Sequence, residues 1–79
     1  MKNVNDNAES SRSQTKRILE YLKDGHSITP LEALRMFSCF RLGARIAEIS
    51  EIVGYKLPRK KVQVRNAEGK DVWVMQYSL

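Results

Sequence analysis

The sequence lacks most of the features that would assign it to a class of enzyme, membrane protein or secreted protein. It has one cysteine, so no disulfide can form within the chain and no zinc site can be built from several cysteines. It has one histidine, and no apolar run approaches the roughly 18 residues that cross a bilayer. Residues 1–14 carry no apolar segment typical of a secretory signal. We therefore expect a cytoplasmic protein that is not an enzyme and has no catalytic residues, metal or other cofactor.

The basic residues are concentrated in the last third of the chain. The whole chain carries 14 Lys and Arg against 9 Asp and Glu, which gives a formal net charge of +5. Residues 54–79 hold six basic and two acidic side chains, and so carry most of the excess. Such a local positive field attracts polyanions, of which phosphate backbones are the usual example.

One folded domain is predicted over residues 13–79, preceded by a tail over residues 1–12. The tail is polar and its charges balance, so we expect it to be disordered. A chain of this length supports one domain with a thin core. A first helix is predicted from about Gln14 to Lys23, with Ser13 as its N-cap.

Two further helices follow in close succession. Thr29, Pro30 and Glu32 form the signature of a capping box with proline at the first helical position, which predicts a helix ending near Phe37. After a short break, apolar residues at helical spacing predict a third helix from Phe40 or Arg41 to Val53. The core residues expected from the three helices are Ile18, Leu19, Leu22, Leu31, Leu34, Phe37, Leu42, Ile46, Ile49 and Val53.

After residue 54 the periodicity changes from helical to alternating. Val62 and Val64 alternate with polar residues, Trp73 belongs to a second alternating run, and residues 66–69 read Asn-Ala-Glu-Gly, a turn signal. This pattern predicts a β-hairpin with Lys61, Gln63 and Arg65 on one face of its first strand. The aromatic residues are expected in the core, with those of the hairpin turned toward the helices: Phe37, Phe40, Tyr55, Trp73 and Tyr77.

The order of these elements predicts an α+β fold, a winged helix-turn-helix of three helices followed by a C-terminal β-hairpin wing. A short helix followed closely by a longer one that bears arginines on its open face is typical of a helix-turn-helix. The tight turn holds one face of the second helix out from the body. A DNA major groove, about 12 Å wide, accepts such a helix.

The stretch RILEYLKDGHSITPLEALRMFSCFRLGARIAEISEIVGY resembles the small winged helix-turn-helix domains of bacteria and their prophages. The shared features are an opening RILEYL helix, the SITPLEAL segment, an RLxARI helix and a GY step into the hairpin. The resemblance extends from about Thr15 to Leu79. It implies a DNA-binding protein that acts as a transcriptional regulator or accessory factor of a prophage or mobile element.

The candidate DNA contacts lie in the turn, in the third helix and in the wing. Arg41 is at the start of the third helix, the part that usually reaches base edges, and Ser38 precedes it in the turn. Arg45 either contacts the groove or pairs with Glu32 of the preceding helix. The predicted wing supplies a positive patch for phosphates or the minor groove, made of Arg59, Lys60, Lys61, Arg65 and Lys70.

The leading interpretation is therefore a binder of double-stranded DNA, with another protein or a second copy of the chain as a further partner. No membrane and no small-molecule ligand are expected. The alternative is a protein–protein interaction module without DNA binding, since Glu48 and Glu51 on the third helix would repel phosphates and a fold does not fix a function. Cys39 is expected to be a buried structural thiol, and His26 an exposed loop residue.

Overall fold

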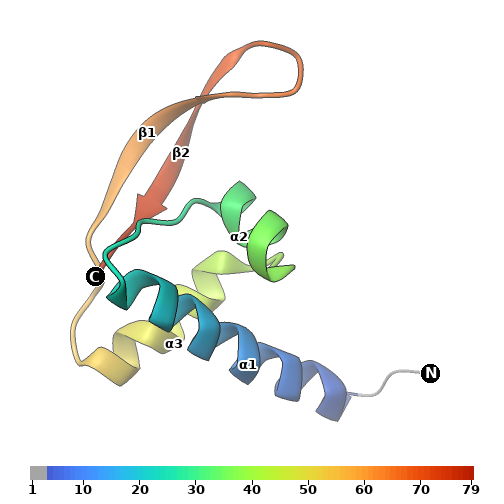
Figure 1. Cartoon of the computed structure of the whole chain (residues 1–79), viewed down its shortest axis with the longest axis vertical. Helices are drawn as coiled ribbons and strands as arrows, with labels where there is room; N and C mark the ends of the chain where they lie inside the picture. The colour runs from blue at the N-terminus through green and yellow to red at the C-terminus, as the bar shows by residue number, and fades with distance from the viewer. Residues whose placement is uncertain (1–3) are drawn as a thin grey trace.

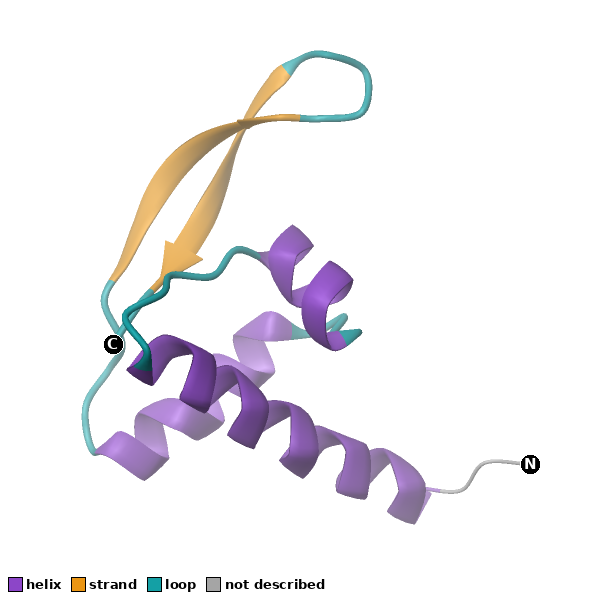
Figure 2. Ribbon diagram, viewed as in Figure 1, coloured by secondary structure: helices purple, strands orange, loops and turns teal. Residues whose placement is uncertain are grey.

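A computed structural model describes the backbone of residues 4–79 and the side chains of residues 12–79. Three helices precede two antiparallel strands, as predicted. In Figure 1 the helices gather at one end of the molecule, and the hairpin projects beyond them. Figure 2 shows the same arrangement by secondary structure, with loops joining the elements. The elements are α1 (Val4–Lys23), α2 (Pro30–Phe37), α3 (Leu42–Val53), β1 (Arg59–Arg65) and β2 (Asp71–Tyr77).

Helix α1 begins at Val4, well before the start near Gln14 that the sequence predicts. Residues 4–12 contain neither glycine nor proline, the residues that most strongly oppose a helix. Their polarity suggested a tail, but polarity alone does not stop a helix. Ser13 therefore lies inside α1 and is not its N-cap. The part of the predicted tail that precedes Val4 is outside the described residues.

Hydrogen bonds fix both ends of α2. The N–H of Glu32 donates to Thr29 Oγ1 at 3.4 Å and the N–H of Thr29 donates to Glu32 Oε1 at 3.0 Å, which confirms the capping box. At the other end Ser38 adopts the left-handed conformation, with φ of 54°. Gln14 of α1 donates its side-chain amide to the carbonyls of Phe37 and Ser38, at 3.3 and 3.0 Å. Helix α1 thus holds the turn between α2 and α3, a role of Gln14 that the sequence did not predict.

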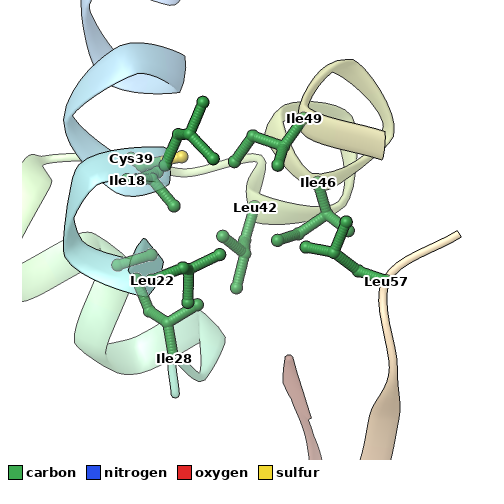
Figure 3. Close-up of a cluster of buried hydrophobic side chains, with 10 residues drawn as sticks. Ile18, Leu22, Ile28, Cys39, Leu42, Ile46, Ile49 and Leu57 are labelled. Atoms are coloured by element: carbon green, nitrogen blue, oxygen red, sulfur yellow. The ribbon is translucent and has the colours of Figure 1, made fainter. Parts of the chain in front are cut away.

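The core lies between α1, α3 and the base of the hairpin (Figure 3). Helices α1 and α3 bury the residues that their spacing predicts, except that Val53 is half-buried. Helix α2 differs, because Leu31 and Leu34 are exposed and the small Ala33 is its buried residue. The burial expected for Cys39 is confirmed. The buried apolar residues are Ile18, Leu19, Leu22, Ile28, Ala33, Cys39, Leu42, Ile46, Ile49 and Leu57.

The hairpin is attached to the helices through the segment between α1 and α2. The N–H of Ile28 donates to the carbonyl of Tyr77 at 2.9 Å, and the N–H of Tyr77 donates to the carbonyl of Ile28 at 2.9 Å. At the far end, Gly69 has a φ of 82°, which its position in the turn requires and which glycine adopts without strain. The root of the hairpin is therefore tied to the core, while its tip stands free of the helices (Figure 1).

Candidate nucleic-acid interface

The two faces of the hairpin differ in chemistry. Residues that pair directly in an antiparallel ladder project to the same face. The pairs Val62–Val74 and Val64–Val72 form one half-buried face, called here the valine face, which lies beside α2 across a groove. The opposite face, called here the basic face, carries Arg59, Lys61, Gln63, Arg65, Asp71, Trp73, Met75 and Tyr77.

The cations predicted for the wing do not all lie on one face. Lys61 pairs with Met75 on the basic face, together with Arg59 and Arg65, whereas Lys60 pairs with Gln76 on the valine face. Lys70 lies in the turn next to the hairpin tip. The alternation that the sequence predicts for β1 is confirmed. It places Lys60 and Lys61 on opposite faces, although the sequence-based prediction grouped them in one positive patch.

The basic face continues at its root into a groove beside α3. Arg59 and Tyr77 belong to that face and also line the groove. Because side chains alternate along a strand, the other β1 cations of the basic face, Lys61 and Arg65, extend outward from the same side. The remaining lining residues are Gly43, Ile46, Ala47 and Ser50 of α3, with Lys56 and Leu57 of the following loop.

The part of α3 that faces this groove is small and nearly uncharged. We call Gly43, Ala47 and Ser50 the small-residue strip of α3. A Cβ added at Gly43 would meet no atom within 4 Å, so the strip is open to a ligand. Ser50 Oγ already accepts the N–H of Leu57, at 3.4 Å. The strip therefore allows a close approach but offers few groups that could distinguish one base from another.

Arg45 is turned away from this surface and toward α1. Its side chain is 11% exposed, and Nη2 donates to Glu48 Oε2 at 3.2 Å. Arg45 Nε lies 3.1 Å from Glu48 Oε1 but forms no well-aligned hydrogen bond there. Thr15 of α1 donates its hydroxyl to the same carboxylate. Of the two alternatives for Arg45, the pair with Glu32 does not form, because Glu32 caps α2 and Arg45 pairs with Glu48, one turn along α3.

The start of α3 is exposed. Arg41 is the N-cap of the helix, and its carbonyl accepts the N–H groups of Ala44 and Arg45, at 3.1 and 3.3 Å. Within the described residues, no ion pair engages the guanidinium of Arg41. Ser38 is also exposed, with its carbonyl bound to Gln14. Both side chains are therefore accessible to a ligand, and DNA contact by Arg41 and Ser38 remains a prediction.

Three aromatic residues that the sequence assigns to the core are exposed, namely Phe40 at 85%, Trp73 at 64% and Tyr55 at 49%. The assignment of Trp73 failed because alternation along β2 does not tell which face meets the helices. Pairing with Gln63 puts Trp73 on the basic face. His26 is exposed, as predicted, and stacks on Tyr21 with ring centroids 4.3 Å apart.

The outer half of the basic face contains one weak ion pair. Arg65 Nε lies 3.5 Å from Asp71 Oδ1, and the two side chains are 72% and 49% exposed. Pairs this exposed contribute about 0–1 kcal/mol to stability. Arg65 can therefore leave Asp71 for a phosphate at little cost. Lys70, beyond this pair, donates its backbone N–H to Asn66 Oδ1, which orders the turn, and no ion pair with another described residue engages its ammonium group.

A tight pair of helices with an exposed second helix, followed by a hairpin with a cationic face, defines a winged helix domain, a class whose members generally bind DNA. The winged helix-turn-helix domain family matches residues 13–79, and the chain belongs to that family. No curated protein and no solved structure gave a significant match. Domains of this kind are typically non-catalytic.

Residues 12–79 contain no group of His, Cys, Asp and Glu side chains that could hold a metal ion. None of the described helices is both long enough and apolar enough to span a membrane.

Proposed function

We propose that the protein binds double-stranded DNA in the bacterial cytoplasm, as a transcriptional regulator or accessory factor of a prophage or other mobile element. The start of α3 enters the major groove, and the basic face of the wing lies on phosphates. The observation that carries this proposal is the groove in which the small-residue strip of α3 meets Lys56 and Arg59. A duplex that rests on one of these surfaces can reach the other.

The contacts divide into two kinds. Arg41 stands at the helix start, where a guanidinium can donate to guanine O6 and N7 and discriminate against other bases by about 1–3 kcal/mol. Arg59, Lys61 and Arg65 of the basic face, with Lys56 below them and Lys70 at the tip, neutralise phosphates without reading sequence. Arg45 is not one of these contacts because its guanidinium is engaged with Glu48, and Lys60 is peripheral because it lies on the valine face.

The salt dependence of duplex binding tests this function. If about five cations neutralise phosphates, the logarithm of the binding constant should fall with the logarithm of salt concentration with a slope of about −4 to −5. The measurement is a titration of a labelled duplex by fluorescence anisotropy at several salt concentrations. An absence of binding even at low salt would refute the proposal.

Sequence preference is expected to depend on Arg41. After selection from a random duplex library, Arg41→Ala should flatten the preference between sequences, because it removes the group closest to the base edges. Lys23→Ala is the matched control, since Lys23 is an exposed cation in the last turn of α1. If the selected sequences are unchanged by Arg41→Ala, the residue contacts only phosphate or solvent.

A protein-interaction module is the second candidate function, and one observation favours it. Ile52 is 62% exposed and lines a groove between α1 and α3. The groove also carries Lys16 from α1 and Glu51 from α3, so that a second copy of the chain could match its charges. Under this alternative, light scattering detects a stable oligomer that Ile52→Glu dissociates, and the duplex titration shows no binding.

A further inference from the structure

Trp73 is a large side chain that the folded core does not use. It is 64% exposed, whereas its neighbours on β2, Val72 and Val74, are half-buried on the other face. Within residues 12–79, no ring stacking or cation–π contact involves Trp73. An indole ring can bury about 150–250 Å² of surface, so leaving it in water forgoes a large stabilisation. The stability of the fold therefore does not explain this position.

Two cations lie next to Trp73 on the basic face. Gln63 is directly opposite on β1, and Lys61 and Arg65 occupy the two diagonal positions on the same face. Diagonal neighbours in a sheet lie about 7–8 Å apart, within reach of long side chains. Asp71 is the acidic residue nearby, and it is loosely paired with Arg65. An aromatic surface between two cations fits a polymer in which charged phosphates alternate with uncharged sugars and bases.

We propose that Trp73 contacts bound duplex DNA directly, with its ring packed against the deoxyriboses between phosphates held by Lys61 and Arg65. This inference rests on the proposed DNA binding and adds an uncharged contact on the wing. Trp73 stands on the flat of the ribbon, two residues inside the start of β2, and not in the turn at the tip. In the proposed complex the ring therefore lies along the wall of a DNA groove, unlike the apolar side chains that some proteins insert between base pairs.

An uncharged contact has a distinct thermodynamic signature. Packing on the sugars removes part of the apolar indole surface from water, so Trp73→Ala should weaken duplex binding roughly tenfold. Because no counterion is released at an indole, the slope of affinity against salt should not change. Lys61→Ala, the adjacent control on the same face, should instead reduce the magnitude of that slope by about 0.9. Trp73→Phe should retain most of the affinity.

The experiment uses the intrinsic fluorescence of the full chain, because Trp73 is its one tryptophan. A labelled duplex is titrated at low salt, and binding is followed by label anisotropy while acrylamide quenching reports access to the indole. We expect the quenching constant to fall as the duplex saturates. An unlabelled single strand of the same length provides a comparison, and circular dichroism checks that each variant is folded.

The outcomes separate the two proposals. The contact is overturned, and DNA binding stays intact, if the duplex binds while the indole is quenched as readily as in the free protein and Trp73→Ala binds with full affinity. Stronger protection by the single strand than by the duplex would also overturn it, in favour of a platform for unpaired bases. No duplex binding at low salt would remove the proposed function and, with it, this inference.

Discussion

Adjacent lysines on β1 should contribute unequally to DNA binding, because the register sends them to opposite faces of the hairpin. Lys61 shares the basic face with Arg59 and Arg65, and Lys60 shares the valine face with Gln76. We expect Lys61→Ala to weaken duplex binding and Lys60→Ala to have little effect. The two substitutions change the same residue type in the same strand, so each is a control for the other.

The magnitude follows from counterion release. One neutralised phosphate contributes about 0.9 to the slope of the logarithm of the binding constant against the logarithm of salt concentration. For Lys61→Ala this corresponds to about an eightfold loss of affinity in 0.1 M salt. The loss should grow to about fifteenfold in 0.05 M salt and shrink to about fourfold in 0.2 M salt. Both lysines are exposed, so each substitution should change the free energy of unfolding by less than about 0.5 kcal/mol.

Anisotropy titrations of one labelled duplex against both variants and the parent protein, at three salt concentrations, measure these quantities. Thermal unfolding by circular dichroism confirms that the two variants are equally folded. Equal losses of affinity would mean that DNA touches both faces, as it would if the hairpin entered a groove edge-on. A larger loss for Lys60→Ala would show that the valine face is the one that meets DNA.

Three predictions concern the stability of the helices and of the turn, and each is measured by thermal or urea unfolding. Gly43→Ala should raise the melting temperature by about 2–8 °C, because a Cβ there meets no other atom and alanine favours a helix by about 0.5–1 kcal/mol. Gly54→Ala should lower the melting temperature, because Gly54 has a φ of 88°, which strains alanine. Shifts of the same sign in the two variants would contradict this reasoning. Ser38→Gly should stabilise the protein by about 1 kcal/mol, since the left-handed conformation strains serine, and no gain would mean that the surrounding contacts already offset this strain. Glu48→Ala should destabilise the protein by about 1–3 kcal/mol, because it leaves Arg45 buried without its partner. The folded variant should bind DNA at least as tightly as the parent protein. Weaker binding would mean that Arg45 or Glu48 takes part in the contact with DNA.

The elements that the sequence predicts well are those fixed by neighbouring residues. The capping box depends on Thr29, on Glu32 three residues later and on the backbone N–H groups of the same two residues, so a local pattern contains all the information. The end of α3 at Gly54 and the turn with Gly69 are local in the same sense. The core stripe of α3 is also predictable, because its apolar spacing admits one inward direction.

The predictions that failed depend on contacts between elements. The sequence-based prediction turned Trp73 toward the helices, whereas the register between β1 and β2 places it on the face that carries Lys61. The partner of Arg45 is a different case, because Glu48 lies three residues along the same helix, a spacing at which side chains meet, and the prediction considered only Glu32, which is occupied as the cap of α2. The choice of Ala33 over Leu31 as the buried residue of α2 likewise depends on how closely that helix approaches the core.

The chemistry of α3 implies that affinity and sequence preference depend on different parts of the proposed interface. A strip of glycine, alanine and serine can approach DNA closely but cannot supply the charged or bidentate donors that discriminate bases, and the guanidinium of α3 that could do so is held by Glu48. In the proposed complex we therefore expect affinity to come mainly from the wing, through phosphate contacts and the indole of Trp73, and sequence preference to come from Arg41 at the helix start. Such a protein should show steep salt dependence and shallow sequence preference. A tenfold or greater preference between sequences that survives Arg41→Ala would contradict this expectation, because residues other than Arg41 would then have to contact the bases.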